Sequence, residues 1–146
     1  YGIHDLSRTE LDPKTKLPRF NMPLELGVFL GATYLGDKRH QQKKCLILDK
    51  EKYRYQKFIS DIAGNDPESH DNKPEKIIAK VRNWLAHASK RTDIPGPSQI
   101  IRSFNLFNEE LPIMCKEAPI KVNELEFYDY ALMIAKFIKR FTSKGA

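Results

Sequence analysis

Glu25 is a single carboxylate within a long apolar stretch of the sequence. It is the one charged residue between Met22 and Gly36, where the apolar side chains predict a helix. An acid near a helix start stabilises the helix dipole, and on position alone this is the commoner role. The apolar neighbours, however, predict a helix covered on most sides, where a carboxylate without a purpose is costly. Glu25 is therefore our candidate catalytic residue, able to face a sugar ring and stabilise or attack an oxocarbenium-like centre.

Further polar residues are expected near Glu25. The first predicted strand ends at Asp5 and Ser7, and the loop after it brings Arg19, Asn21 and Met22 to the helix start. In an open α/β sheet, ligands bind beyond the carboxyl ends of the strands. We therefore predict that these five residues bind the substrate.

Two of these residues keep a structural alternative. Asp5 can hold ribose or base hydroxyls and amines, or it can cap the following loop through its own backbone. Arg19 can meet a phosphate, although a solvated loop arginine is the commoner case. The sequence leaves both pairs of alternatives open.

The histidines and cysteines do not suggest a metal site or a nucleophile. His4 points away from Asp5 across the strand, as expected for a satisfied core histidine. His40, His70 and His87 share no metal-ligand spacing. The two cysteines are far apart and predict reduced, buried thiols in a cytosolic protein. There is no glycine-rich phosphate loop, and neither a metal nor a cofactor is expected.

The net charge of +6 is concentrated in residues 38–57. This segment holds eight basic residues against two acids, and the remainder of the chain balances at 17 against 17. Aromatic residues alternate with the cations between Lys50 and Phe58, a mixture that suits nucleic acid. The same charge would attract a pyrophosphate, and a solvated loop with inward aromatics is the plainer interpretation.

The elements form a βαβ unit followed by helices. Residues 2–6 predict a buried strand, 21–35 a helix with Asn21 as its N-cap, and 45–48 a second strand ending at Asp49. Such a unit implies parallel strands. Residues 51–72 predict an excursion with a helical turn near 55–62. Three helices follow, opening at Pro74, at Ser98, and at Asn123 with Glu126 as a capping box.

Two parallel strands are too few for a stable core. Either a strand is hidden in residues 63–95, or strands upstream of Tyr1 complete the sheet, and we favour the second, an N-terminal truncation. The 146 residues predict one α/β domain, with the βαβ core and site in 1–65 and a helix-rich remainder in 66–146. No signal peptide or membrane helix is expected, so we predict a cytoplasmic protein.

Two blocks of sequence resemble one family. His4–Ser7 with Phe20–Gly27, and then Tyr53–Gly64, are similar to bacterial proteins of the Toll/interleukin receptor-like or nucleoside deoxyribosyltransferase-like fold. The family signature is a strand ending in Asp, a loop, and a helix opening Phe-Glu-Leu-Gly. Here Leu24 replaces the phenylalanine, and Glu25 occupies the position of the glutamate.

The resemblance implies a flavodoxin-like three-layer fold and cleavage of an N-glycosidic bond in a nucleoside or in NAD. Glu25 would be the catalytic carboxylate, with Asp5 and Asn21 contacting the substrate. The family's first strand and its loop would precede Tyr1.

We thus expect a nucleotide-binding domain acting as an N-glycosidase (a hydrolase of NAD) or as a deoxyribosyltransferase, with a small-molecule nucleotide as its partner. The first alternative is a non-catalytic nucleotide sensor. The second is a nucleic-acid-binding protein that uses residues 38–57. A homo-oligomer is left open, and a membrane partner is not expected.

Overall fold

The chain divides into two compact units. The computed structural model describes residues 1–142, with the side chains of residues 1–140. Unit 1 comprises Tyr1–Pro97 and unit 2 comprises Ser98–Ala146. Each unit has its own hydrophobic core, and each is described by itself below. That the chain is one α/β domain stays a prediction.

Unit 1 is built on a small parallel sheet. The strands β1 (Gly2–Asp5), β2 (Cys45–Asp49) and β3 (Glu68–Ser69) lie in the order β1-β2-β3. Ile3 pairs with Leu46 and Asp49 with Ser69, and both pairings are parallel. The predicted βαβ unit and the mixed α/β class are therefore confirmed. The third strand lies within residues 63–95, the less favoured of our two alternatives.

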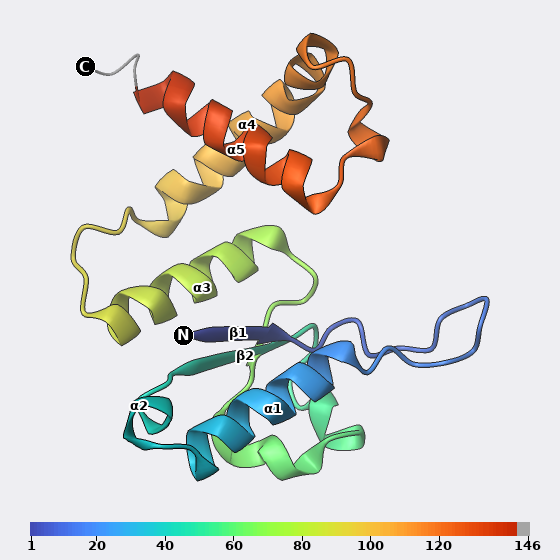
Figure 1. Ribbon diagram of the computed structural model, residues 1–146, viewed down its shortest axis with the longest axis vertical. Coiled ribbons are helices and arrows are strands. Elements are labelled where there is room, and N and C mark those ends of the chain that lie inside the picture. The colour runs from blue at the N-terminus through green and yellow to red at the C-terminus, as the bar shows by residue number, and fades with distance from the viewer. Residues whose placement is uncertain (143–146) are drawn as a thin grey trace. The chain divides into compact units, whose positions relative to one another are not determined.

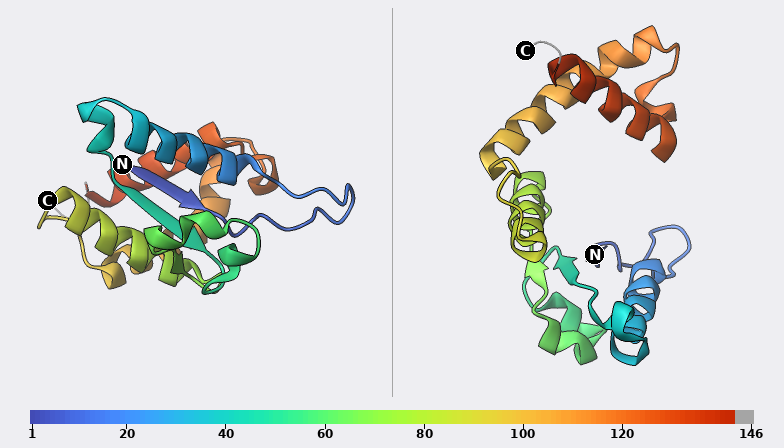
Figure 2. Two further views of the ribbon diagram at one scale, coloured as in Figure 1. Left: turned by 90° about the horizontal axis from the view of Figure 1, so that it is seen from below. Right: turned by 60° about the vertical axis from the view of Figure 1, so that its left-hand side comes forward.

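Helices cover both faces of this sheet. The helices α1 (Asn21–Leu35) and α3 (Pro74–Ser89) lie on opposite sides of β1 and β2 (Figures 1 and 2). The core between α1 and the sheet is formed by Leu6, Leu26, Ile47, Tyr55 and Ile62. On the other face, the Tyr1 and Trp84 rings meet edge to face with centroids 5.8 Å apart. Unit 1 thus consists of one short sheet with a helix on each side.

The helix α1 is far less covered than its composition predicts. Leu26 is its one buried residue, whereas Leu24 is 69% exposed and Leu35 is 90% exposed. Apart from the neighbouring backbone of α1 itself, no described atom lies within 4 Å of a Cβ built on Gly27 or Gly31. The prediction of a helix covered on most sides is wrong, because the described chain covers only the stripe of α1 that faces the sheet.

Short elements connect the strands of unit 1. Helix α2 (Lys38–Gln41) begins at Asp37, whose Oδ1 accepts a hydrogen bond of 3.0 Å from the His40 N–H. The 3₁₀ helices η1 (Arg54–Lys57) and η2 (Ser60–Asn65) occupy the predicted helical turn after β2. Helix α3 begins at Pro74, as predicted from the tolerance of the first turn for proline.

Unit 2 consists of two long helices joined through a 3₁₀ turn. These are α4 (Pro97–Glu117), η3 (Val122–Glu124) and α5 (Phe127–Thr142). Their core is formed by Phe107, Leu111, Met114, Cys115, Met133 and Phe137. None of the helices in residues 1–142 combines the length and apolar character that crossing a membrane requires.

Three predicted helix caps are wrong. The Leu24 N–H donates to the Phe20 carbonyl, so α1 already includes Asn21, which makes no side-chain cap bond. Ser98 lies inside α4, which begins one residue earlier. Asn123 belongs to η3, and α5 is instead preceded by Glu126, whose N–H donates to the Asp129 carboxylate at 3.2 Å. Which residue caps a helix depends on where the chain first turns. The type of a side chain does not determine that position by itself.

Candidate functional site

A polar pocket lies at the carboxyl edge of the sheet in unit 1. It has a volume of about 400 Å³ and receives residues that follow all three strands. Asp5 ends β1, Lys50 follows β2, and His70 follows β3. The lining residues are Asp5, Ser7, Arg8, Glu10, Lys50, His70, Asn72 and Ile77. We call this the strand-end pocket.

Asp5 is held in this pocket by two donors. Its Oδ1 accepts the Ser7 N–H at 2.9 Å and lies 3.3 Å from His70 Nε2. The first bond is the loop cap considered for Asp5, so the structural role is present. Since Asp5 also lines the pocket, the carboxylate is fixed in position where a ligand can reach it.

His70 is a residue that sequence reasoning missed. It is 1% exposed, and its Nδ1 accepts the Asn72 N–H at 3.1 Å. Because Nδ1 accepts this hydrogen bond, the ring proton lies on Nε2, which donates it to Asp5. The signal for this role was the position of His70 directly after a strand, but Glu68–Ser69 carries no apolar pattern that predicts a strand.

A buried ion pair lies beneath the loops of this edge. Asp49 is 1% exposed, and its Oδ1 accepts Arg54 Nε at 2.9 Å and Nη2 at 2.6 Å. Arg54 Nη2 also donates to the Leu6 carbonyl and to Thr9 Oγ1. Arg54 thereby ties the end of β2 to the chain that leaves β1. Asp49 Oδ2 has no hydrogen-bond partner among the described residues.

Lys50 and Glu10 form an ion pair on the rim of the strand-end pocket. The hydrogen bond and charge of Lys50 hold the pKa of the Glu10 carboxyl below its usual value. Lys50 also lies 3.8 Å from a Glu51 carboxylate oxygen. A ligand anion in the pocket would compete with these acids for Lys50.

A second pocket lies beside the start of α1. It has a volume of about 260 Å³ and is lined by Arg8, Arg19, Asn21, Met22 and Glu25. We call this the helix-start pocket. Arg8, which the sequence analysis overlooked, lines both pockets. The six predicted site residues are thus divided: Asp5 and Ser7 line one pocket, and the other four line its neighbour.

Glu25 is exposed and is not the buried carboxylate that the sequence predicted. Its side chain is at the surface because the described part of α1 is covered on one stripe only. Burial therefore does not support a catalytic role for Glu25. That role now depends on the place of Glu25 in the helix-start pocket beside Arg8 and Arg19.

His4 is buried, but it is not satisfied. Neither ring nitrogen has a hydrogen-bond partner in the described chain, and the ring meets Phe29 edge to face. Burial lowers the pKa of His4, and the negative charge of Glu25 partly opposes this shift. The prediction that His4 is a core residue is thus confirmed, whereas the prediction that its ring is satisfied is wrong for the described chain.

This unsatisfied histidine predicts a pH dependence of stability. Because burial depresses the pKa of folded His4, its contribution is present above about pH 6.5 and is lost as the pH falls through the folded pKa. Between pH 7 and pH 5, we expect His4→Phe to lose less unfolding free energy than the wild type loses. The difference is at most about 1.4 kcal/mol per pH unit. Urea unfolding at both pH values measures it, with exposed His87→Gln as control; equal losses in wild type and His4→Phe would contradict it.

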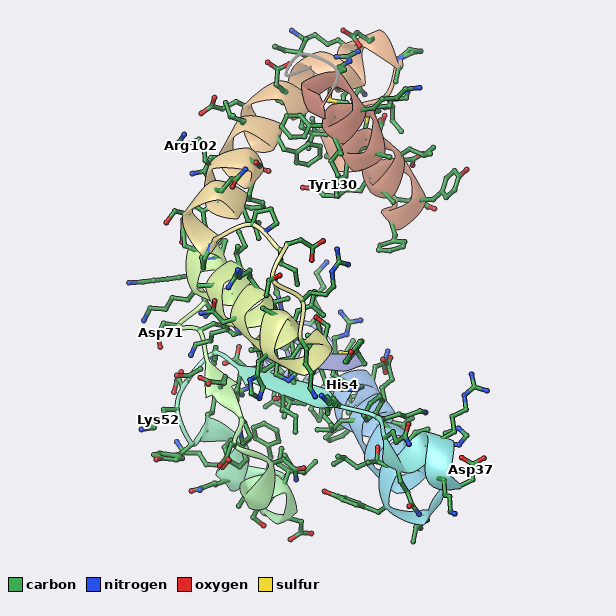
Figure 3. The ribbon with its side chains drawn as sticks, turned by 90° about the vertical axis from the view of Figure 1, so that its left-hand side faces the viewer. His4, Asp37, Lys52, Asp71, Arg102 and Tyr130 are labelled. Carbon is green, nitrogen blue, oxygen red and sulfur yellow. The ribbon has the colours of Figure 1, made fainter. Side chains whose placement is uncertain are left out.

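The basic segment 38–57 does not form one surface. Strand β2 separates its two halves, so Asp37 and Lys52 lie toward opposite ends of that strand (Figure 3). Arg54 is occupied by Asp49, Lys44 Nζ donates to the Ala88 carbonyl at 2.7 Å, and Tyr55 is buried. The plainer interpretation, aromatics packed inward, is confirmed for Tyr55 alone, because Tyr53 and Phe58 are exposed.

Comparisons of this chain with protein-family models, with curated proteins and with solved structures found no match. Within residues 1–142, no three His, Cys, Asp or Glu side chains are grouped so that they could hold a metal ion. The two neighbouring pockets are therefore the features of the described chain that bear on function.

Proposed function

We propose that unit 1 binds a nucleotide across the strand-end and helix-start pockets. The observation that supports this most is Arg8, a cation that lines both pockets at the carboxyl edge of a parallel sheet. This edge is where open α/β sheets bind ligands. A ligand with an anionic centre and a polar group on each side matches such a pair of pockets.

The charges of the pockets support one arrangement of the nucleotide. Arg8 and Arg19 present guanidinium donors, which suit the planar, bidentate binding of phosphate. Asp5, fixed by Ser7 and His70, accepts hydrogen bonds from ribose hydroxyls. Glu25 then faces the sugar on the helix-start side of the phosphates.

In this position Glu25 supports cleavage of an N-glycosidic bond. Its carboxylate stabilises the positive charge that develops at the anomeric carbon, or attacks that carbon. The carbon–nitrogen bond breaks, and the base leaves with the electron pair. Water then adds to the anomeric carbon, displaces the Glu25 carboxylate where it has bonded there, and loses a proton.

The helix-start pocket favours one kind of leaving group. Glu25 is the one acid among the described residues that line it, so no second carboxyl group is there to protonate a departing base. Nicotinamide leaves from the pyridinium form of NAD as a neutral molecule and needs no proton. NAD or NADP is therefore a better substrate for this pocket than a neutral nucleoside.

The presence of a single acid among the described residues of the helix-start pocket also favours a second candidate, a nucleotide sensor without turnover. A single exposed carboxylate beside two arginines is also compatible with simple recognition of a sugar. Both candidates use the same pockets, and only product formation separates them.

Base release separates the two candidates. The full chain is incubated with NAD, NADP and common nucleosides, and free base is measured by chromatography. We expect nicotinamide from NAD or NADP and no base from neutral nucleosides. Saturable NAD binding without nicotinamide release would favour the sensor, and release from neutral nucleosides alone would contradict the role given to the leaving group.

Arg8→Gln tests the shared cation. We expect a loss of NAD affinity of about tenfold, the size of one charge-assisted hydrogen bond. Arg39→Gln in α2 is the matched control, since it removes the same charge from an exposed residue that lines neither pocket. Calorimetric titration measures both, and equal affinities for the two variants would contradict phosphate binding by Arg8.

A further inference from the structure

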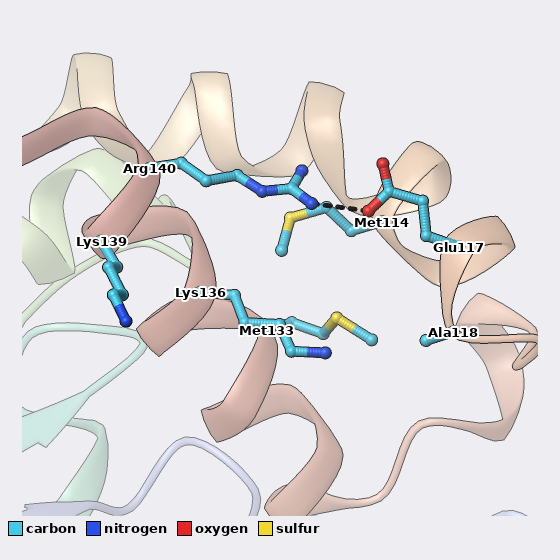
Figure 4. A pocket seen from close by; sticks show the side chains of 7 residues that line it. All are labelled: Met114, Glu117, Ala118, Met133, Lys136, Lys139 and Arg140. Carbon is cyan, nitrogen blue, oxygen red and sulfur yellow. Dashed lines mark hydrogen bonds and ion pairs between the residues drawn. The ribbon is translucent and has the colours of Figure 1, made fainter. Parts of the chain in front are cut away.

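Unit 2 contains a pocket that the proposed function does not use. It has a volume of about 590 Å³ and lies between the end of α4 and the middle and last turns of α5. Figure 4 shows side chains from both helices around it. This volume falls within the range of small-molecule sites.

The floor of this pocket is apolar and adaptable. It is formed by Met114 and Met133, both buried in the unit 2 core, with Ala118 beside them. Methionine side chains are unbranched and flexible, so they fit apolar groups of varied shape. An alkyl chain laid over these thioethers would remove apolar surface from water.

One wall of the pocket is cationic. Lys136, Lys139 and Arg140 are three or four residues apart in α5, so they lie on one side of the helix. The one acid among the described lining residues is Glu117 of α4. Lys136 and Arg140 alone outnumber this acid, which favours an anion in the pocket.

The acid is already paired with one of these cations. Arg140 Nη2 donates to Glu117 Oε2 at 2.6 Å, and both side chains are about half exposed (Figure 4). Exposed ion pairs contribute little to stability, so a second carboxylate can replace Glu117 at small cost. Glu117 therefore occupies the position that a ligand anion would take.

We propose that this pocket binds a single-chain amphiphilic anion, such as a medium-chain or long-chain carboxylate. The alkyl chain lies over Met114 and Met133, and the carboxylate accepts hydrogen bonds from Arg140 and Lys136. Glu117 is a competitor for Arg140 and limits the affinity. A free small molecule is favoured over a membrane surface because apolar floor and cationic wall lie within one pocket.

Three probes test the chemical class. Decanoate, decanol and acetate are each titrated into the full chain by calorimetry, below the concentration at which decanoate aggregates. Decanoate is expected to bind saturably, and decanol and acetate at least about tenfold more weakly, because each lacks one half of the contacts. Equal binding of decanol, no binding of decanoate, or recruitment to anionic vesicles without decanoate binding would overturn the proposal.

Substitutions of the ion pair give the sharper test. Glu117→Gln is expected to tighten decanoate binding several-fold by releasing Arg140, whereas Arg140→Gln weakens it about tenfold. Arg140→Lys keeps the charge and retains most of the affinity, which guards against an unfolded glutamine variant. Lys116→Gln, exposed on α4, is the matched control. If Glu117→Gln binds decanoate no more tightly than wild type, the competition is absent and the proposal is wrong.

This proposal is independent of the nucleotide site. The pocket lies wholly in unit 2, whereas the strand-end and helix-start pockets lie in unit 1. Glu25→Gln should therefore leave decanoate affinity unchanged.

Discussion

Glu25→Gln is expected to abolish nicotinamide release while NAD still binds. Glutamine keeps the size and hydrogen-bonding capacity of the side chain, but it has no negative charge to stabilise the developing cation at the anomeric carbon. Removing one such preorganised group slows turnover by at least about a hundredfold. The measurement is base release by chromatography beside calorimetric titration of NAD.

The control for this variant is Glu75→Gln. Glu75 lies in the first turn of α3, is exposed and lines neither pocket, so Glu75→Gln removes the same charge without removing a lining residue. Full turnover by Glu25→Gln would contradict the catalytic role. A loss of NAD affinity as large as the loss of turnover would assign Glu25 to binding alone.

Arg54→Leu is expected to destabilise unit 1 strongly. Its partner Asp49 is almost fully buried and already has one oxygen without a hydrogen bond. Removing the arginine would leave a buried charge uncompensated, which costs about 3–5 kcal/mol of unfolding free energy. The bonds to Leu6 and Thr9 that fix the strand-end loops would be lost too.

Trp84 gives a direct readout of this effect. It is the one tryptophan of the chain and lies in α3, so its fluorescence during urea unfolding reports on unit 1. Arg91→Leu is the matched control, since the Arg91–Asp93 pair is exposed and contributes little. If both leucine variants unfold at the same urea concentration, Asp49 does not depend on Arg54. Partial recovery of stability on adding Asp49→Asn to Arg54→Leu would support the assignment to charge.

The local sequence predicts the parts of the fold that depend on short-range rules. The apolar run of β2 and the proline at the start of α3 each favour one local structure, and both predictions are confirmed. Strand β3 was not assigned because its two residues pair through backbone hydrogen bonds and carry no apolar alternation. His70 was missed for the same reason, since its role depends on that strand.

The composition of a helix does not tell which of its sides is covered. The stretch around Glu25 is almost entirely apolar, yet the described chain covers only the stripe through Leu26. The place of Glu25 at the start of α1 was correctly derived, but its burial was not. Sequence reasoning brought Asp5, Ser7 and the helix-start residues to one edge of the sheet, whereas their division between two pockets joined by Arg8 required the structure.

The central claim is that one nucleotide occupies both pockets at once. A titration of the ¹⁵N-labelled chain with NAD, followed through backbone amide resonances, tests it directly. We expect the amides of Asp5 and Ser7, and those of Asn21 and Glu25, to shift with one common dissociation constant. Shifts confined to one pocket, different constants for the two pockets, or no shifts in either would contradict it.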